Sequence, residues 1–349
     1  MVQIEKKSDI RTLTRDEIEA WVLKNNEKKF RAGQIYEWLW EKSAISFDEM
    51  TNLSKDLRKR LIEHFVIHPL TEDKVQISSD GTIKTRFQLH DGHFIESVLI
   101  PVIKDNRYTV CVSSQIGCSL TCKFCATGKM KRIRNLDPAE IYDQVVMVNR
   151  QSLEHFGKPL TNIVYMGMGE PLLTYKNVLK SIEHICSPAG LNMSPKRITV
   201  STAGIAKMIK KLADDQVKFN LALSLHAADD RKRNEIMPIN EQNNLDVLIE
   251  ALKYFHTNTR NRISFEYIAF QDFNDSLEDA ANLAKLCRQF PVKINIIEYN
   301  PIEGASFQKA KTNKIDAFAN YLTKRNIMVT VRRSRGKDID AACGQLANK

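Results

Sequence analysis

The sequence predicts an α/β fold in which an incomplete barrel of six βα units follows a small helical domain and a β-hairpin region. Three observations lead to this prediction. Helical patterns fill the first 70 residues, an alternation with a period of two occupies 72–103, and short β-rich runs alternate with helical stretches from residue 109 onward. A βα alternation of this kind builds a parallel sheet with helices on its outside.

The first segment, 1–70, is predicted to be a helical domain that serves as an accessory or RNA-binding unit. The stretch TRDEIEAWVLKNN opens with a threonine and an acidic first turn, which is typical of a helix start. Three tryptophans follow the helical spacing: Trp21, Trp38 and Trp40. Aromatic residues at that spacing usually belong to a hydrophobic core, and stacking on RNA bases is the alternative.

The second segment, 71–105, is predicted to be a β-hairpin region that links two domains. Turn signals at Asp80-Gly81 and Asp91-Gly92 flank the alternating stretch TIKTRFQLH. In the next strand, HFIESVLIP, Glu96 lies on the same face as three apolar side chains. Its carboxylate is therefore expected to be partly desolvated, and a solvated or ion-paired glutamate at a sheet edge is the alternative.

The third segment, 106–349, carries the βα repeat. Its six β-rich runs are TVCVSSQ, NIVYMG, RITVST, FNLALSL, ISFEYIAF and INIIEY. Six units fit an incomplete barrel better than the eight of a closed one, and a doubly wound open sheet is the alternative. In either architecture the ligand site lies at the carboxyl ends of the strands. A seventh run, MVTVRRS, leads into a tail that holds Cys343.

The composition limits the class of protein. The chain has 349 residues and a formal net charge of +10, which suits an anionic partner, most commonly nucleic acid. No apolar run approaches the roughly 20 residues that cross a bilayer. The charged start MVQIEKKSDIR lacks the apolar centre of a signal peptide. We therefore expect a cytoplasmic protein that does not enter a membrane.

Three of the seven cysteines form a motif: Cys118, Cys122 and Cys125 lie within GCSLTCKFCATG. A reducing cytosol disfavours structural disulfides, so clustered thiols there indicate metal ligands or catalytic groups. Three thiolates in one loop can hold a cubane iron–sulfur cluster and leave one iron open, because such clusters usually take four ligands. Zinc would need a fourth ligand, and the nearest downstream histidine, His155, lies beyond a predicted helix. Three unrelated buried thiols are the remaining alternative.

This cysteine motif, placed after the first strand of a βα repeat, resembles the signature of the radical S-adenosylmethionine (radical SAM) superfamily. The resemblance implies a partial barrel with a 4Fe–4S cluster on Cys118, Cys122 and Cys125, and with S-adenosylmethionine bound at the open iron. The turn YMGMGEP follows the second β run, and its glycines would let the backbone approach that cofactor closely.

Further motifs extend the resemblance. In this order along the chain, MGMGEPL, STAGI, LSLHA, YNP and RGKDIDAACGQL resemble the RlmN family of adenine carbon-2 RNA methyltransferases. The likeness runs from about residue 28 to residue 347. The related Cfr family modifies carbon 8 of the same kind of adenine, and Pro171 is similar to the carbon-2 branch. A carbon-8 methyltransferase is therefore the closest alternative.

The resemblance implies roles for single residues. Glu96 corresponds to the proton acceptor, Cys343 to the cysteine that carries the methyl group, and Cys111 to its resolving partner. The expected S-adenosylmethionine contacts all fall at the ends of β runs: Gly169, Glu170, Ser201, Ser224, Leu225, His226 and Asn300. A buried structural histidine is the alternative for His226, and a buried strand cysteine is the alternative for Cys111.

The implied reaction uses two molecules of S-adenosylmethionine per methylation. The Cys343 thiolate takes a methyl group from the first, and a radical derived from the second turns this group into a methylene radical that adds to carbon 2. A radical route is needed because carbon 2 of adenine has no nucleophilic character. Attack by Cys111 on the Cys343 sulfur then releases the RNA and leaves a disulfide that must be reduced.

The implied partners are 23S ribosomal RNA, the anticodon loop of transfer RNAs and an electron donor such as flavodoxin, and the protein is expected to be a monomer. Two basic runs flank the predicted site and are expected to contact phosphates. They hold Lys129, Lys131, Arg132 and Arg134, and Arg332, Arg333, Arg335 and Lys337. Two other classes stay open: a non-catalytic RNA-binding module with a structural metal, and an iron–sulfur electron carrier.

Overall fold

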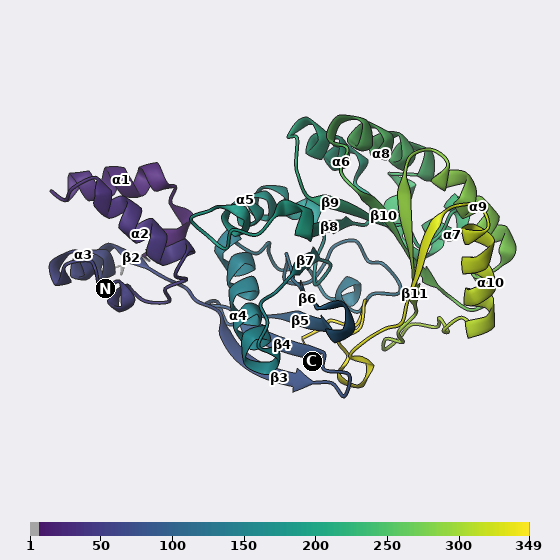
Figure 1. Ribbon diagram of the computed structural model, residues 1–349, viewed down its shortest axis with the longest axis horizontal. Helices are drawn as coiled ribbons and strands as arrows, with labels where there is room; N and C mark the ends of the chain where they lie inside the picture. Colours follow the sequence, from purple (N-terminus) through teal and green to yellow (C-terminus); the bar gives the residue numbers. More distant parts are fainter. Residues whose placement is uncertain (1–6, 349) are drawn as a thin grey trace.

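A ten-stranded sheet organises residues 7–348, the part of the chain that the computed structural model describes. Its strands are β3 (Thr71–Ile77), β4 (Ile83–Gln88), β5 (Phe94–Val102), β6 (Arg107–Cys111), β7 (Asn162–Tyr165), β8 (Ile198–Thr202), β9 (Asn220–Ser224), β10 (Ile263–Ala269), β11 (Val292–Glu298) and β12 (Met328–Arg332). They lie in the order β12-β11-β10-β9-β8-β7-β6-β5-β4-β3 (Figure 1). Pairing is antiparallel from β3 to β6 and parallel from β6 to β12. In the described chain β3 and β12 are sheet edges, so the barrel is incomplete, as predicted.

Helices connect the parallel strands. They are α4 (Pro138–Phe156), α5 (Tyr175–Cys186), α6 (Ala206–Asp214), α7 (Asp230–Ile236), α8 (Leu245–Thr259), α9 (Leu277–Cys287) and α10 (Thr312–Thr323). Figure 1 shows α6, α8, α9 and α10 along the outside of the curved sheet, which is the arrangement of a partial barrel. All six predicted β-rich runs and the seventh one form strands, and the predicted fold class is confirmed.

Side chains alternate across the parallel strands and so separate the core from the site. Leu221 and Leu223 of β9, and Ile294 and Ile296 of β11, are buried in the large apolar core. The intervening positions of neighbouring strands carry polar side chains that bond to one another across the other face. Ser201 and Ser224 have their hydroxyls 3.3 Å apart, and Asn295 donates to the Glu266 carboxylate at 2.7 Å. The inner face of the sheet is therefore polar, while its outer face is sealed by helices.

The antiparallel strands from 71–105 extend this sheet and do not stand apart from it. The helix α4 covers one of their faces, where Ser97 donates to Gln144 at 2.7 Å and Thr85 donates to Gln151 at 3.2 Å. The opposite face, with Glu96, meets the C-terminal tail (Figure 1). The segment thus has a structural role beyond that of a linker, and the division of the chain at residues 70 and 105 stays a prediction.

Three helices form the N-terminal part: α1 (Arg15–Lys24), α2 (Phe30–Trp40) and α3 (Lys55–His64). As the sequence predicted, α1 begins after a threonine, whose side chain accepts a hydrogen bond from the backbone N–H of Glu17. A two-stranded parallel pair, β1 (Ser8–Asp9) and β2 (Phe65–Val66), joins the two ends of this part. The described residues contain no helix that is long and apolar enough to cross a membrane.

Trp40 joins the N-terminal helices to the sheet. Its ring stacks on that of His184 in α5, with centroids 3.5 Å apart and an angle of 4° between the planes. The ring of Tyr142 in α4 meets it edge-on, and the Tyr142 hydroxyl donates to the Trp40 carbonyl. Trp40 is therefore a core residue, whereas Trp21 and Trp38 are only partly buried.

We expect Trp40→Ala to lower the free energy of unfolding by about 3–5 kcal/mol, because it empties a fully buried aromatic site between α2, α4 and α5. Denaturant unfolding followed by circular dichroism measures this loss. Trp38→Ala is the matched control, since it removes the same side chain from a partly exposed position of the same helix. Equal losses in the two variants would contradict the role of Trp40.

Candidate active site at the carboxyl ends of the strands

The three motif cysteines lie on the loop that follows β6. The loop turns at Gly117, where φ is 72° and a Cβ atom would meet the carbonyl oxygen of Lys131 at 2.2 Å. The backbone N–H of Lys123 donates to the Ile236 carbonyl at 3.0 Å and so ties the loop to α7. A small apolar cluster at the carboxyl ends of the strands packs against one side of the loop, and its three cysteines are partly buried.

The thiols of this loop fit an iron–sulfur cluster. Burial raises the pKa of all three, to about 11 for Cys118, and the neighbouring charge of Cys125 adds to the shift of Cys118 and Cys122. Within residues 7–348, no three His, Cys, Asp or Glu side chains are grouped closely enough to share one metal ion. The thiolates of a cubane cluster bind different iron atoms and therefore lie further apart than the ligands of one ion. Iron binding would replace the three protons and offset the cost of burying thiolates.

Glu170 links the ends of β7 and β8. One carboxylate oxygen accepts a hydrogen bond from the backbone N–H of Ala203 at 2.8 Å, and the other accepts one from Leu172 at 2.9 Å. Burial raises the pKa of Glu170, and these backbone hydrogen bonds oppose the shift. Gly169 has a φ of 96°, and a Cβ atom there would lie 2.5 Å from the side chain of Gln115. A glycine is therefore needed at this position because any side chain would collide with Gln115, independently of a bound ligand.

His226 follows β9 and holds two neighbouring strands together. Its Nδ1 accepts a hydrogen bond from the backbone N–H of Ile268 at 3.1 Å, and its backbone has a φ of 56°. Burial lowers the pKa of His226 to about 3, so the ring is neutral and carries its proton on Nε2. The ring also meets Phe124 of the cysteine loop edge-on, with centroids 4.7 Å apart. His226 thus links the ends of β9 and β10, and its contact with S-adenosylmethionine, through the Nε2 donor, stays a prediction.

The remaining predicted cofactor contacts lie on the same end of the sheet. Ser201 and Ser224 share a hydrogen bond, and the buried Leu225 donates its backbone N–H to the Glu266 carbonyl at 3.0 Å. Asn300, after β11, donates to the carbonyl of Cys343 at 3.4 Å. The predicted set is thus brought together, and Asn300 contacts the C-terminal tail directly.

Arg233 of α7 is a buried residue beside the site that the sequence analysis missed. It is completely buried and donates to the carbonyls of Ala203, Ser224 and Leu225, all at the strand ends of the site. Its fourth partner is the side chain of Asn240. Burial lowers its pKa to about 10, and the nearby Cys122 thiol acts in the opposite direction. In the sequence it stands in the charged run DDRKRNEI, which is typical of a solvated helix face, so no local signal reveals its burial.

The C-terminal tail, 336–348, is held by the turn between β3 and β4. Asp338 accepts hydrogen bonds from the Ser78 hydroxyl at 2.6 Å and from the Ser79 backbone at 3.1 Å. In the opposite direction, the Gly336 backbone donates to the Asp80 carboxylate at 3.0 Å. These contacts join positions more than two hundred residues apart in the sequence. They fix the start of the tail.

The end of the tail is held by β5 and by the cysteine loop. The Glu96 carboxylate accepts hydrogen bonds from the backbone N–H groups of Ala347 at 2.9 Å and Asn348 at 3.1 Å. The Thr127 hydroxyl donates to the carbonyl of Leu346 at 2.6 Å. Glu96 is fully buried and pairs with the buried Lys84, so it is ion-paired, as one alternative of the sequence analysis had it, but it is neither solvated nor on an edge strand. Lys84 was also missed, although Lys84 and Glu96 lie on the same face of two consecutive strands, in diagonal positions.

Cys343 lies between these two anchors and is exposed, while Cys111 is the buried last residue of β6. The two thiols lie close enough that a charge on Cys343 raises the pKa of Cys111. A charge on Cys125 raises the pKa of Cys343 in the same way. The surrounding protein atoms raise the pKa of both Cys111 and Cys343 to about 12. All seven cysteines are free thiols. Both predicted catalytic cysteines are therefore protonated at neutral pH in this arrangement.

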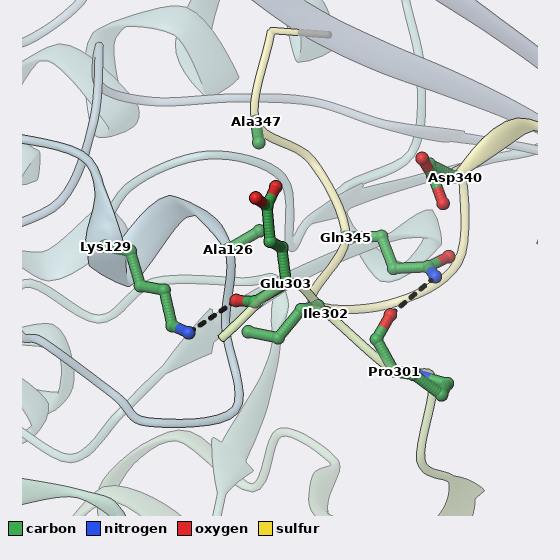
Figure 2. A pocket seen from close by; sticks show the side chains of 8 residues that line it. All are labelled: Ala126, Lys129, Pro301, Ile302, Glu303, Asp340, Gln345 and Ala347. Atoms are coloured by element: carbon green, nitrogen blue, oxygen red, sulfur yellow. Dashed lines mark hydrogen bonds between the residues drawn. The ribbon is translucent and has the colours of Figure 1, made fainter. Parts of the chain in front are cut away.

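A pocket of about 270 Å³ lies where the tail meets the cysteine loop and the loop after β11. Figure 2 shows its lining: Ala126, Lys129, Pro301, Ile302, Glu303, Asp340, Gln345 and Ala347. Lys129 donates to the Glu303 carbonyl at 2.6 Å, and Gln345 donates to the Pro301 carbonyl at 3.2 Å. The pocket opens beside the catalytic tail and adjoins the basic run that follows the cysteine loop.

The two basic runs are only partly available to a partner. Arg134 pairs with Asp91 and Glu140, and Arg333 and Lys337 pair with Glu298. The others have neutral partners or none: Lys129, Arg132 and Arg335 donate to carbonyl or amide oxygens, while Lys131 and Arg332 have no hydrogen bond or ion pair within the described chain. The prediction that these runs contact phosphates stays a prediction, and it fits Lys131 and Arg332 best.

Comparisons with known proteins agree with this fold and site. The model of the radical SAM superfamily matches residues 112–284, and that of the ribosomal RNA large subunit methyltransferase N-terminal domain (RlmN_N) matches residues 8–67. A crystal structure of a radical SAM methyltransferase from Sphaerobacter thermophilus is 39% identical, covers 98% of this chain and 100% of its own, and gives a TM-score of 0.92. HydG, a maturase of FeFe-hydrogenase, gives a TM-score of 0.51 at 14% identity over 68% of this chain and 55% of its own, and shows the fold alone. Fold and cysteine loop together define a radical SAM enzyme, which uses a 4Fe–4S cluster and S-adenosylmethionine.

Full-length relatives identify the family. A probable dual-specificity RNA methyltransferase RlmN from Cytophaga hutchinsonii is 58% identical over 99% of this chain and 94% of the relative. A dual-specificity RNA methyltransferase RlmN from Nautilia profundicola is 42% identical over 93% of this chain and 94% of the relative. The chain belongs to the RlmN family of radical SAM RNA methyltransferases.

We expect Arg233→Met to lower the free energy of unfolding by about 3–5 kcal/mol, because it leaves buried carbonyls at two strand ends without a donor. Arg231→Met is the matched control, since Arg231 is exposed on the same helix. Thermal unfolding of the two variants under the same conditions measures the difference. A loss that is no larger for Arg233→Met than for the control would contradict the assignment.

The carboxylate of Glu298 predicts a pH dependence. Burial opposes its ionisation, but hydrogen bonds from Arg333, Lys337 and Lys309 outweigh this effect and lower the pKa to about 2. The ionised group therefore stabilises the fold above the ordinary carboxyl pKa, and this contribution is lost as the pH falls toward 2. We expect Glu298→Gln to cost about 1–2 kcal/mol at pH 7.

Urea unfolding between pH 3 and pH 7 measures the difference in the free energy of unfolding between the native protein and Glu298→Gln. It should shrink as the pH falls below about 4.5, where the unfolded carboxyl begins to take up a proton. Glu278→Gln, at an exposed position of α9, should show no such trend. A difference for Glu298→Gln that stays constant over the whole range would contradict the pKa assignment.

Proposed function

We propose that the protein methylates carbon 2 of adenine in 23S ribosomal RNA and in transfer RNA, with the methyl group carried by Cys343. The observation that supports this most directly is the position of the tail. Its Gly344 carbonyl accepts a hydrogen bond at 2.7 Å from the backbone N–H of Ala126, next to the cluster loop. Its Cys343 thiol lies close enough to Cys111 for a charge on one to change the pKa of the other. One sulfur can thus exchange between the cofactor side of the site and a resolving thiol.

The chemistry of the substrate explains why such a site is needed. Carbon 2 of adenine lies between two ring nitrogens and is electron-poor, so it cannot attack a sulfonium methyl group. When bound, the cluster and S-adenosylmethionine supply the one-electron chemistry that makes a methyl carbon reactive enough to add there. The protein must then hold the methyl group, accept a proton and release the product.

Each of these tasks has a residue. The Cys343 thiolate takes the methyl group by displacement and becomes S-methylcysteine. Once a hydrogen atom is removed from this methyl group, its carbon adds to carbon 2; the adduct would then return one electron to the cluster and pass the carbon-2 proton to Glu96. Cys111 attacks the Cys343 sulfur, so that the carbon–sulfur bond breaks and a disulfide forms; the electron pair of that bond stays on the former methylene carbon, which takes up a proton as the methylated RNA leaves. Because both thiols have a pKa near 12 in the present arrangement, each has to lose its proton before it reacts.

The cluster is held by Cys118, Cys122 and Cys125 in this proposal. S-adenosylmethionine lies against the strand ends, near Gly169, Glu170, Ser201, Ser224, Leu225, His226 and Asn300. Its adenosyl and amino acid groups there meet serine hydroxyls, backbone carbonyls and the Nε2 donor of His226. Arg233 donates hydrogen bonds to backbone carbonyls at the same strand ends.

The proposal also names partners. The N-terminal helices and the basic runs beside the pocket bind the RNA, and a target adenine leaves its stack to reach the site, which favours loops in ribosomal and transfer RNA. An electron donor such as flavodoxin reduces the cluster, and the protein acts as a monomer in the cytoplasm, where these RNAs are found. The dual-specificity relatives support both kinds of substrate.

The product is tested by mass spectrometry of adenosines from ribosomal and transfer RNA, with and without the gene. We expect 2-methyladenosine to disappear from both RNAs when the gene is deleted. Loss of 8-methyladenosine would instead indicate a carbon-8 enzyme of the Cfr type. Loss of neither would overturn the proposed function. A protein purified without air that holds no iron or sulfide would also overturn it.

We expect Cys111→Ala to accumulate protein joined covalently to RNA, because the adduct forms on Cys343 and then lacks the thiol that releases it. Denaturing electrophoresis with labelled RNA measures the adduct. Cys343→Ala should keep its iron and form no adduct. Cys186→Ala, which removes a thiol at the end of α5, is the control and should turn over normally. Normal turnover by Cys111→Ala would show that its resolving role is wrong.

A further inference from the structure

A buried lysine stands beside the proposed proton acceptor. Lys84 of β4 is 3% exposed, and its Nζ lies 3.5 Å from Oε1 of Glu96, whose side chain is 0% exposed. No other cation of residues 7–348 makes an ion pair with Glu96. Lysine is rarely buried unless it is paired, so this position calls for an explanation.

The two oxygens of the Glu96 carboxylate have different surroundings. Oε2 accepts the backbone hydrogen bonds of Ala347 and Asn348 in the tail. Oε1 accepts no hydrogen bond from the described residues and has only the longer contact with Lys84. Oε1 is therefore the oxygen that can take up a proton without releasing the tail.

Lys84 also contacts the tail itself. Its Nζ donates to the carbonyl oxygen of Asp340 at 3.4 Å, just before Cys343, while Glu96 holds Ala347 just after it. The lysine and the glutamate lie on adjacent antiparallel strands and face the same side of the sheet. Together they hold the tail on both sides of the reactive sulfur.

The charge of Lys84 matters because Glu96 is completely buried. An isolated buried charge is costly, so a carboxylate in such a place needs a counter-charge. The ammonium group of Lys84 supplies this counter-charge from within the protein, next to the oxygen that is free.

We propose that Lys84 is a positioning residue of the methylation reaction, which holds the Glu96 carboxylate in register with the Cys343 tail. This inference rests on the proposed function, in which the C2–H bond of adenine breaks and its proton goes to Glu96. Lys84 touches neither the RNA nor the transferred carbon in this scheme. It acts through Glu96 and through its contact with the tail at Asp340.

The experiment follows the carbon-2 hydrogen. The RNA substrate carries deuterium at carbon 2 of the target adenine, and the protein carries Cys111→Ala so that the covalent adduct accumulates. Mass spectrometry of the digested adduct measures the fraction that has kept deuterium at each time. Because deuterium is counted per adduct, the readout does not depend on how much of a variant is folded.

Three changes at Lys84 separate charge from packing. Lys84→Met removes both charge and donor, Lys84→Gln keeps a donor for the Asp340 carbonyl without the charge, and Lys84→Arg keeps the charge. We expect deuterium loss from the adduct to slow by about tenfold or more in the two neutral variants and to return toward the starting rate in Lys84→Arg. Lys74→Met, on the exposed strand β3, is the matched control and should not change the rate.

The possible results distinguish a failure of the inference about Lys84 from a failure of the proposed function. Deuterium loss at the starting rate in Lys84→Met or Lys84→Gln would overturn the inference, and so would an equally slow rate in Lys84→Arg. Either result leaves the proposed function intact, because the adduct still forms. If Cys111→Ala with native Lys84 forms no adduct, the proposed function itself is wrong, and the role of Lys84 falls with it.

Discussion

The hydrogen bonds that the Glu96 carboxylate accepts from Ala347 and Asn348 hold the end of the chain over the carboxyl ends of the strands. Chain ends usually fray, because few contacts offset the entropy lost on ordering them. Here the acceptor is a fully buried carboxylate beside a buried lysine, and charge-assisted hydrogen bonds of this kind are roughly twice as strong as neutral ones. The place of Cys343, near both Cys111 and the cysteine loop, depends on this contact.

This dependence explains the antiparallel strands β3 to β5. A parallel barrel strand has one face toward the helices and one toward the interior, and neither face can receive a chain end from outside. The extension offers two faces beyond the barrel: α4 packs on one through Gln144 and Gln151, and the tail lies on the other. The turn between β3 and β4 adds the second anchor at Asp338. The segment 71–105 thus completes the site, which is more than its predicted linker role.

The sequence predicted the features that depend on local pattern. Alternation and helix periodicity located all the strands from β4 onward, and the sequence placed Cys118, Cys122 and Cys125 in one loop after the first barrel strand. The sequence did not predict the burial of Lys84 and Arg233, because it depends on partners far along the chain. Lys84 contacts the tail, and Arg233 contacts the ends of β8 and β9. Charged residues are normally exposed, so a local pattern predicts them at the surface. The role of Gly169 was predicted only in part, since its close neighbour is Gln115.

In the ordered arrangement the thiols of the site are not in their reactive form. Cys111 and Cys343 have pKa values near 12, and one oxygen of Glu96 is occupied by the tail backbone. Under the proposed function, Cys343 must reach a methyl donor, an adenine and Cys111 in turn, so its segment has to rearrange during each cycle. A single hydrogen bond contributes only about 1 kcal/mol net to stability, so release of one anchor needs far less free energy than global unfolding. Since Asp338 binds the β3–β4 turn independently of Glu96, the segment after it can open while its start stays fixed. Under the proposed function, only the residues around Cys343 therefore have to move for its sulfur to reach the three partners in turn.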